Sequence, residues 1–543
     1  MKKNKIIAAI LLLSTLTFYS CQKDFLDLAP NENISEEQAF STMIQTENFA
    51  NNIYAELPKY QTRVSHRFTT VDCLSDEAAP TYFGDGRTFN GGGYGPTNIT
   101  DYLGDIWANA YRNIRKTNIL LEKLPTVPAI NAGDEDTRKR LRGEALFLRA
   151  FSYFDVLKFF GRFPIIDKPF APDADFKVAR NTYDECVAFL QKDLDEAVTL
   201  LPATYPANSL GRANKAMCLA LKSRLLLYAA SPLNSADNAA KWQAAAQAAK
   251  ELIDLNQYSL YNQNADKAEN YKAIFNVFAN NEVIWFMNLG NGKDFEQNYY
   301  PASNGGWGDE TPTQNLVDEY QMSNGKSITD PTSGYDPAKP YLNREPRFYA
   351  TVWYNGAVLR GIRIQTNPGG NAAINGGNDN TRTGYYTRKF CDESVDLNSG
   401  PGKQMMSIWF RLGETYLNYA EASNEANSSP SADPLIYTYI NLIRSRAGLP
   451  GLTAGLSKDE MRLAIRHERR VELSFEEHRF FDDRRWKLSF GGQIKGIVWA
   501  DPAGTSFSLI TAENRPFNQK MWYMPIPQKE IDITKIEQNP GWQ

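Results

Sequence analysis

One stretch, residues 141–161, constrains the fold more than any other part of this sequence. Its apolar side chains recur at steps of four, three, four and three, the spacing of one helix face: Leu146, Ala150, Tyr153, Leu157 and Phe160. Three further rings, at 147, 151 and 154, widen this face. A helix this apolar must be largely buried, and Gly161 followed by Pro164 ends it. The rest of the chain must therefore supply elements that cover it.

Further helices are predicted on both sides of this one. Their apolar or alanine-rich patterns cover residues 214–230, 242–255, 408–426, 437–447 and 461–487. The helices follow one another as antiparallel-looking pairs in which small residues face large ones, which is typical of tetratricopeptide-like helical repeats. No strict period of about 34 residues holds, so the repeat is degenerate. We predict a mainly α fold with a helical-repeat scaffold.

Two long regions between the helices have a different composition. Residues 81–101 and 291–402 are rich in Gly, Asn, Pro and aromatic residues, and residues 367–380 read as one long loop. Short strands are predicted at 283–288 and 350–354. Loops this long inside a compact protein are usually functional. No Ser/Pro-rich linker divides the chain, so we expect one compact body with a few short strands.

The N-terminus predicts export and a lipid anchor. Lys2, Lys3 and Lys5 precede an apolar run at 6–16, which is shorter than the ~20 residues needed to cross a bilayer core. Residues 1–20 therefore read as a cleaved signal peptide. Ser20 before Cys21 resembles the lipobox of bacterial lipoproteins, in which the cysteine is acylated, and residues 22–24 resemble the signal for export to the outer cell surface in Bacteroidetes. The alternative is a plain secreted protein with an accidental Cys21.

Charge and cysteine content exclude two classes of function. Without the three lysines of residues 1–20, the mature chain has 56 basic and 63 acidic residues, a balance that argues against nucleic acid as a partner. The remaining cysteines are far apart and lack the CxxC spacing of a zinc site: Cys73, Cys186, Cys218 and Cys391. We predict that they are buried free thiols.

Clustered carboxylates raise the possibility of a hydrolase. Glu472, Glu476 and Glu477 lie among arginines, and paired carboxylates are the catalytic groups of glycosidases. Spacings of three residues, however, favour helical ion pairs: Arg469–Glu472, Glu476–Arg479 and Asp482–Arg485. His66, His467 and His478 suggest neither a Ser-His-Asp triad nor a metal site, and glycine-rich residues 91–95 lack the ending of a phosphate loop. No catalytic residue, metal or cofactor is predicted.

Across nearly its whole length the chain resembles the SusD/RagB family of outer-membrane nutrient-binding lipoproteins. The resemblance lies in the joint order of short motifs: 21–27 (CQKDFLD), 143–150 (GEALFLRA), 153–154, 160–161, 212–215 (RANK), 221–229 (LKSRLLLYA), 411–417 (RLGETYL), 443–448 (IRSRAG), 468–473 (ERRVEL), 524–527 (MPIP) and 538–542 (QNPGW). It implies a helical N-terminal region at 21–235 and a C-terminal region at 236–543 that carries ligand-facing loops. It also implies a TonB-dependent, SusC-like transporter as partner, and glycans or, in some members, peptides as ligands.

The same resemblance places the ligand surface in the two loop regions. Sugars present flat C–H faces that pack on aromatic rings, with polar groups at the edge. The first region offers Tyr82, Phe89 and Tyr94 with Asp76 and Asn98, beside Phe83 and Arg87. The second offers Tyr299, Tyr300 and Trp307, beside Asn298, Asn304 and Asp309. The alternative for any one ring is that it anchors its loop to the core. Trp307 is the preferred candidate because residues 304–308 give it little local bulk.

Taken together, the sequence predicts a lipid-anchored, cell-surface receptor component that captures an oligo- or polysaccharide and delivers it to an outer-membrane transporter. A peptide-capturing receptor component is the nearest alternative, since peptide sites also use aromatic walls. A lipid-anchored hydrolase is the alternative from another class.

Overall fold

The computed structural model describes residues 35–58, 70–171, 173–236, 238–501 and 503–543. The predicted signal peptide, the predicted acylation site at Cys21, and His66 lie outside the described residues. None of the helices in the described ranges is long and apolar enough to cross a membrane.

A continuous series of helices, each packed on the next, forms the scaffold. Its members are α6 (Ile106–Lys123), α7 (Asp134–Phe160), α8 (Tyr183–Leu200), α9 (Lys215–Ala230), α10 (Ala239–Ile253), α15 (Leu412–Ala426), and α16 (Leu435–Arg446) and α17 (Lys458–Glu472), which both pack on α15. Two N-terminal helices, α2 (Glu36–Ala39) and α3 (Met43–Ala55), cover the start of this series, with α3 packed on α6 and α7. The mainly α-helical prediction is confirmed.

The central helix α7 is buried on more sides than its sequence suggests. From Leu141 to Phe160 every side chain except that of Arg142 is buried, whereas the periodicity predicted one broad apolar face. Helices α3, α6, α8 and α9 surround it. Its internal charges are paired, since Arg149 Nε donates to Asp193 Oδ2 at 2.7 Å. The helix is therefore the centre of the larger apolar core.

Two predicted helices begin or end elsewhere because of distant partners. Ile408 to Arg411 belong to strand β8 (Lys403–Arg411), which pairs antiparallel with β2 (Val283–Gly292), so the helix predicted at 408–426 starts only at Leu412. The helix predicted at 461–487 is broken between α17 and α18 (His478–Arg485). At the break the backbone N–H groups of Phe475 and Glu477 donate to Glu77 and Asp72, about 400 residues earlier in the chain.

The second half of the molecule consists of short elements joined by long loops. Its helices are α4 (Asp85–Asn90), α5 (Ile99–Leu103), α11 (Lys267–Asn276), α12 (Asp294–Tyr299), α13 (Gln314–Val317) and α14 (Pro346–Thr351). A further short helix, α19 (Gln528–Thr534), instead packs against the core of the scaffold through Ile531. Its antiparallel strand pairs are β1 (Ala78–Pro80) with β3 (Glu310–Pro312), β4 (Val352–Trp353) with β7 (Tyr386–Thr387), β5 (Val358–Leu359) with β6 (Ile362–Arg363), and β9 (Gly492–Trp499) with β10 (Phe507–Arg515). The predicted loop at 81–101 thus contains two short helices.

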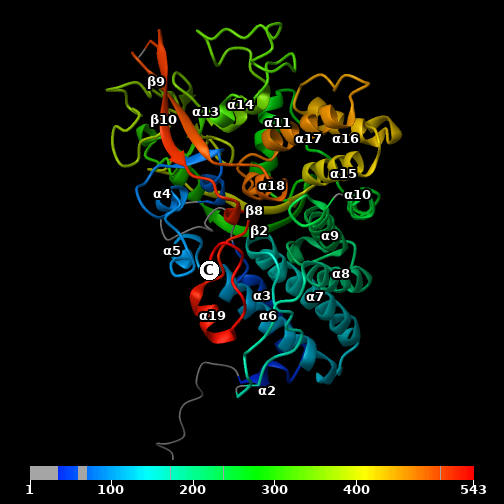
Figure 1. Cartoon of the computed structure of the whole chain (residues 1–543). Coiled ribbons are helices and arrows are strands. Elements are labelled where there is room, and N and C mark those ends of the chain that lie inside the picture. The colour runs from blue at the N-terminus through cyan, green and yellow to red at the C-terminus, as the bar shows by residue number, and fades with distance from the viewer. Residues whose placement is uncertain (1–34, 59–69, 172, 237, 502) are drawn as a thin grey trace, which may run out of the picture.

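Figure 1 shows how the two halves meet. Helices α3 and α6 to α9 fill the lower part, strands β2 and β8 cross the middle, and α15 to α17 lie above with the irregular loops. A second apolar core, distinct from that of the scaffold, lies under these loops and includes Tyr271, Phe348 and Trp353. The four cysteines outside the masked N-terminus are buried and free, as predicted.

Candidate functional site

A short antiparallel ladder joins the two loop regions that the sequence singled out. Strand β1 pairs with β3 so that Pro80 lies opposite Glu310, and the Thr81 N–H donates to the Asp309 carbonyl at 2.9 Å. The Thr81 hydroxyl also donates to the carbonyl of Gly308. Residues 81–87 therefore lie directly beside residues 307–309, although more than 220 positions separate them in the sequence.

A third segment, residues 375–382, completes the site. The Tyr82 hydroxyl donates to Asp379 Oδ1 at 2.5 Å, and Arg382 Nε donates to the Thr81 carbonyl at 2.7 Å. This segment belongs to the long Gly/Asn loop that the sequence indicated as functional by composition. The three segments together form what we call the loop cluster: Tyr82, Phe83, Arg87, Trp307, Asp309, Asp379 and Arg382.

Two glycines set the position of Trp307, whose ring is half-buried. A Cβ at Gly306 would collide with the carbonyl of Tyr300, and one at Gly308 would lie 2.7 Å from the Tyr386 ring. Gly308 also has φ +54°, a conformation that favours glycine. The loop can therefore close against the core on both sides of Trp307, and the Trp307 N–H donates to the Gln297 carbonyl at 2.7 Å.

The residues of the loop cluster differ in their exposure and in their hydrogen bonds. Phe83 is 72% exposed, with the guanidinium of Arg87 4.1 Å and that of Arg382 5.4 Å from its ring centre. Asp309 is buried, and neither carboxylate oxygen has a hydrogen-bond partner among the described residues. Burial, with Glu310 and Asp379 nearby, raises the pKa of Asp309 to about 8. Burial and the bond to Asp379 likewise raise the pKa of Tyr82. The cluster thus combines aromatic surface with polar groups able to bind hydroxyls or charges.

The structure corrects the prediction that Tyr299 and Tyr300 present their rings to a ligand. They are 1% and 0% exposed. Tyr299 packs among core rings that include Phe390, and the Tyr300 ring meets the edge of Trp353 while its hydroxyl donates to the Asp392 carbonyl at 2.8 Å. Both stand at the end of α12, which turns them toward the second core. They anchor the loop that presents Trp307.

Phe89 and Tyr94 are also core residues, which corrects the same prediction for them. Their rings stack on each other at 4.1 Å between centres, and Tyr94 lies 5.1 Å from the Trp542 ring. Asn98 shapes its own loop, since its Oδ1 accepts from the Gly95 N–H at 2.7 Å. Of the aromatic residues in the two predicted loop regions, Tyr82 and Trp307 are half-buried and Phe83 is exposed.

Asp76 is an ion-pair partner rather than part of the loop cluster. Its carboxylate lies 2.9 Å from both Arg470 Nη2 and Arg479 Nε. Burial alone would raise its pKa, but the two arginines hold the pKa of Asp76 below its ordinary value. Its carboxylate is therefore committed to joining the first loop region to α17 and α18.

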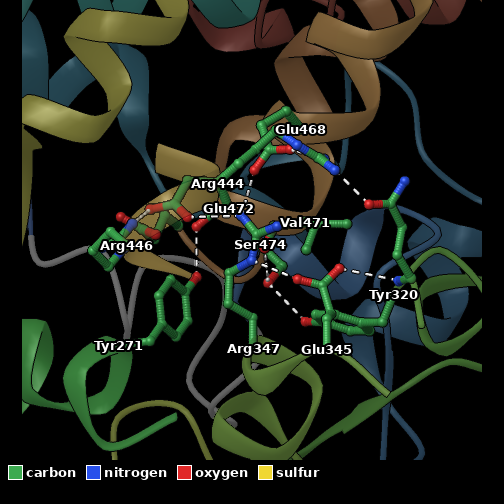
Figure 2. A network of polar contacts seen from close by, with 12 residues as sticks. Tyr271, Tyr320, Glu345, Arg347, Arg444, Arg446, Glu468, Val471, Glu472 and Ser474 are labelled. Carbon is green, nitrogen blue, oxygen red and sulfur yellow. Dashed lines mark hydrogen bonds and ion pairs between the residues drawn. The ribbon is translucent and has the colours of Figure 1, made fainter. Parts of the chain in front are cut away.

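Glu472, one of the carboxylates behind the hydrolase alternative, lies in a buried arginine network together with Glu468 (Figure 2). Arg347 Nη1 lies 2.6 Å from Glu468 and 2.9 Å from Glu472, and Glu472 also pairs with Arg411 and Arg446. Burial alone would raise the pKa of Glu472, but Arg446, Arg411 and Arg347 hold it well below its ordinary value. A glycosidase acid needs a raised pKa, so Glu472 is unsuited to that role.

The predicted local ion pairs are only partly correct. Asp482 and Arg485 do pair at 2.7 Å. Arg469 instead pairs with Asp482, and Glu476 pairs with Arg411 and Lys389. Because the helix breaks between α17 and α18, tertiary partners replace the neighbours three residues away. No group of three or more His, Cys, Asp or Glu residues in the described ranges is arranged to hold a metal ion.

No sequence pattern singles out Asp379 and Arg382 as members of the site. The composition of the 367–380 loop marked the region, but no local signal shows which polar residues reach Tyr82 and Thr81. Pairing of β7 with β4, and contact of β7 with β3, brings this loop back to the other two segments.

Comparisons with known proteins agree with this architecture. A sequence model of the SusD family matches residues 250–542, more than half of the chain. The chain belongs to the SusD family. A second model, described as starch-binding and associating with the outer membrane, matches residues 24–227.

Individual relatives of this SusD-family chain have low sequence identity to it but match most of its length. SusD-like protein P25 of Formosa agariphila is 25% identical over 464 residues, which cover 80% of this chain and 78% of P25. A crystal structure of a SusD-like protein from Bacteroides fragilis has 27% identity and a TM-score of 0.80, and covers 94% of this chain and 100% of that one. A SusD-like carbohydrate-binding protein of the same species, 23% identical, shares the fold with a TM-score of 0.76 over 91% of this chain and 99% of its own.

Proposed function

We propose that the loop cluster captures an oligo- or polysaccharide at the cell surface and that the protein delivers it to a TonB-dependent, SusC-like transporter. The main support is the meeting of Tyr82, Phe83 and Trp307 from two loop regions beside Asp379 and Arg382. Aromatic rings take the C–H faces of sugars, and the polar groups orient their hydroxyls. Family membership and the starch-binding description of the N-terminal match support the same class of ligand.

The proposal includes an outer-membrane location with an N-terminal lipid at Cys21. The match described as associating with the outer membrane supports the location. The signal-peptide pattern and the Ser20–Cys21 boundary in the sequence support the anchor.

A peptide ligand is the alternative within the same class of receptor. The half-buried polar groups of the loop cluster favour a sugar, because Asp379 lies beside Tyr82 and Arg382 beside Phe83, where they can serve as hydroxyl partners. A lipid-anchored hydrolase is less well supported, since Glu472 is paired with buried Arg347 and Arg411, and Glu476 with Arg411 and Lys389.

Titration calorimetry with purified oligosaccharides and with peptides of similar size tests the ligand class, and a reducing-end assay on the same mixtures tests turnover. We expect saturable binding of at least one oligosaccharide without new reducing ends above a boiled control. Binding of peptides alone would replace the proposed ligand, and turnover above the control would replace binding with catalysis.

A further inference from the structure

Two arginines flank the most exposed aromatic residue of the loop cluster. The guanidiniums of Arg87, on α4, and Arg382, on the returning loop, both lie within 5.4 Å of the Phe83 ring centre. Both side chains are only partly buried. Their N–H groups point in part to backbone carbonyls: Arg87 contacts the Pro80 carbonyl at 3.4 Å, and Arg382 contacts the Thr81 carbonyl at 2.7 Å. The carbonyl contacts hold the cations in place without neutralising them.

Few carboxylates of the protein balance these charges. Glu513 approaches Arg87 Nε only to 3.8 Å, and it is already paired with Arg515 at 2.7 Å. Among the described residues, the partners of the Arg382 guanidinium are the neutral Thr81 carbonyl and Asn375 side chain, and Asp379, three residues away, is bonded to Tyr82. Burial and the neighbouring Arg87 lower the pKa of Arg382, so the two cations destabilise each other in the free protein. An anion placed between them would relieve this repulsion.

The hydrogen-bonding capacity of the pair fits a planar or tetrahedral oxyanion. Arg382 uses Nε for Thr81 and Nη1 for the Asn375 side chain, which leaves Nη2 without a partner among the described residues. The Nε and Nη2 groups of Arg87 donate to the Pro80 carbonyl, and its Nη1 group has no hydrogen-bond partner among the described residues. Guanidinium groups bind carboxylates and sulfates through such N–H donors with charge-assisted hydrogen bonds.

We infer that the ligand of the loop cluster is an anionic glycan, whose carboxylate or sulfate group is held by Arg87 and Arg382 while a sugar face packs on Phe83. This inference rests on the proposed function and narrows it to acidic sugars. Uronic acids and sulfated sugars share the required chemistry, so the experiment must separate them.

The test is calorimetric titration with three oligosaccharides of similar length: an oligogalacturonate, a sulfated carrageenan oligosaccharide and a neutral malto-oligosaccharide. We expect one of the two anionic probes to bind at least about tenfold more tightly than the neutral one. That affinity should fall between about 50 mM and about 300 mM salt because the arginines are partly exposed. Whichever probe binds more tightly identifies the anion.

Variants assign the selectivity to the two arginines. Arg382→Gln should reduce the preference for the anionic probe by about tenfold, and Arg382→Lys should restore only part of it because lysine keeps the charge without the fork of donors. Arg112→Gln, at an exposed position on α6, makes the same change of charge away from the cluster and should leave the preference unchanged. Phe83→Ala should weaken the binding of the anionic and of the neutral probe without changing the ratio of their affinities. A merely misfolded variant would lose both.

Each remaining outcome has a definite meaning. If the neutral probe binds as tightly as the anionic probes, the acidic-glycan inference is wrong and the proposed glycan capture stands. If Arg382→Gln keeps the full preference, the arginine pair is not the anion site. If none of the three probes binds, both the inference and the proposed function fail.

Discussion

At the scale of single residues, Trp307 and Tyr300 show why similar aromatic residues in one loop have different roles. Tyr300 follows α12 and points into the second core, where its hydroxyl reaches the Asp392 carbonyl. Trp307 lies between Gly306 and Gly308, which let the backbone approach the core, so the ring stays at the surface and half-buried. The direction of each side chain depends on what the backbone contacts, which residue type alone does not specify.

The first prediction concerns this ring. Trp307→Ala should weaken binding of the cognate oligosaccharide by about 0.5–1.5 kcal/mol beyond the effect of the lost contact area. The melting temperature should change little, because the ring covers no large part of the core. Calorimetric titration beside a thermal melt checks both quantities. An early melt with normal affinity in the folded fraction would assign Trp307 to loop anchoring.

The second prediction concerns the protonation of Asp309. Its folded-state pKa of about 8 lies above the unfolded value near 3.9, so the folded protein keeps a proton that the unfolded chain releases. The free energy of unfolding therefore falls as pH rises through this window. Asp309→Asn cannot titrate, and its stability relative to the parent should be greater at pH 8 than at pH 5 by about 1–3 kcal/mol. Urea unfolding of both proteins at both pH values measures this difference. An equal stability difference between variant and parent at pH 5 and pH 8 would contradict the raised pKa of Asp309.

At the scale of elements, α7 carries the scaffold. Phe154 on this helix is 1% exposed, and its ring centre lies 5.4 Å from that of Tyr228 on α9. Phe154→Ala should lower the free energy of unfolding by about 3–5 kcal/mol through lost burial and a cavity, while folded protein keeps its affinity. Leu463→Ala, at a 66% exposed position on α17, is the control and should cost less than about 0.5 kcal/mol. Equal losses in the two variants would contradict the central position of α7.

The comparison of elements also shows what sequence reasoning can reach. The apolar patterns at 141–161 and 214–230 predict helices from local sequence alone, and the structure contains both helices as α7 and α9. The break before α18 has no such signal, because its backbone donors bind Asp72 and Glu77 from the far end of the chain. The same limit applies to the site. The loop regions could be named from composition, but burial of Phe89, Tyr94, Tyr299 and Tyr300 is decided by tertiary packing.

At the scale of the whole molecule, segments from opposite ends of the chain build the part that contains the loop cluster. Residues 72–77 contact the break before α18, and β1 pairs with β3 beside the loop cluster. The helical series runs from the lower part of the molecule to the upper part, where α15 to α17 lie with the irregular loops (Figure 1). A rigid scaffold that presents loop-borne side chains is a common arrangement for binding proteins.

The prediction at this scale concerns attachment to the membrane. Cys21→Ala should move the protein from the membrane fraction to the soluble fraction. In the prediction the apolar signal peptide is cleaved off, so acyl chains on Cys21 are what anchors the mature protein. Fractionation after a salt wash, with immunodetection, measures the distribution, and the parent protein is the control. Membrane retention of the variant would contradict acylation at Cys21.

The central claim is that the loop cluster is where the glycan binds. A crystal structure with the tightest-binding oligosaccharide tests it most directly. We predict a sugar ring packed on Trp307 or Phe83, with its polar groups within hydrogen-bond distance of Asp379 or Arg382. An ordered oligosaccharide bound elsewhere, with the loop cluster empty, would contradict the claim.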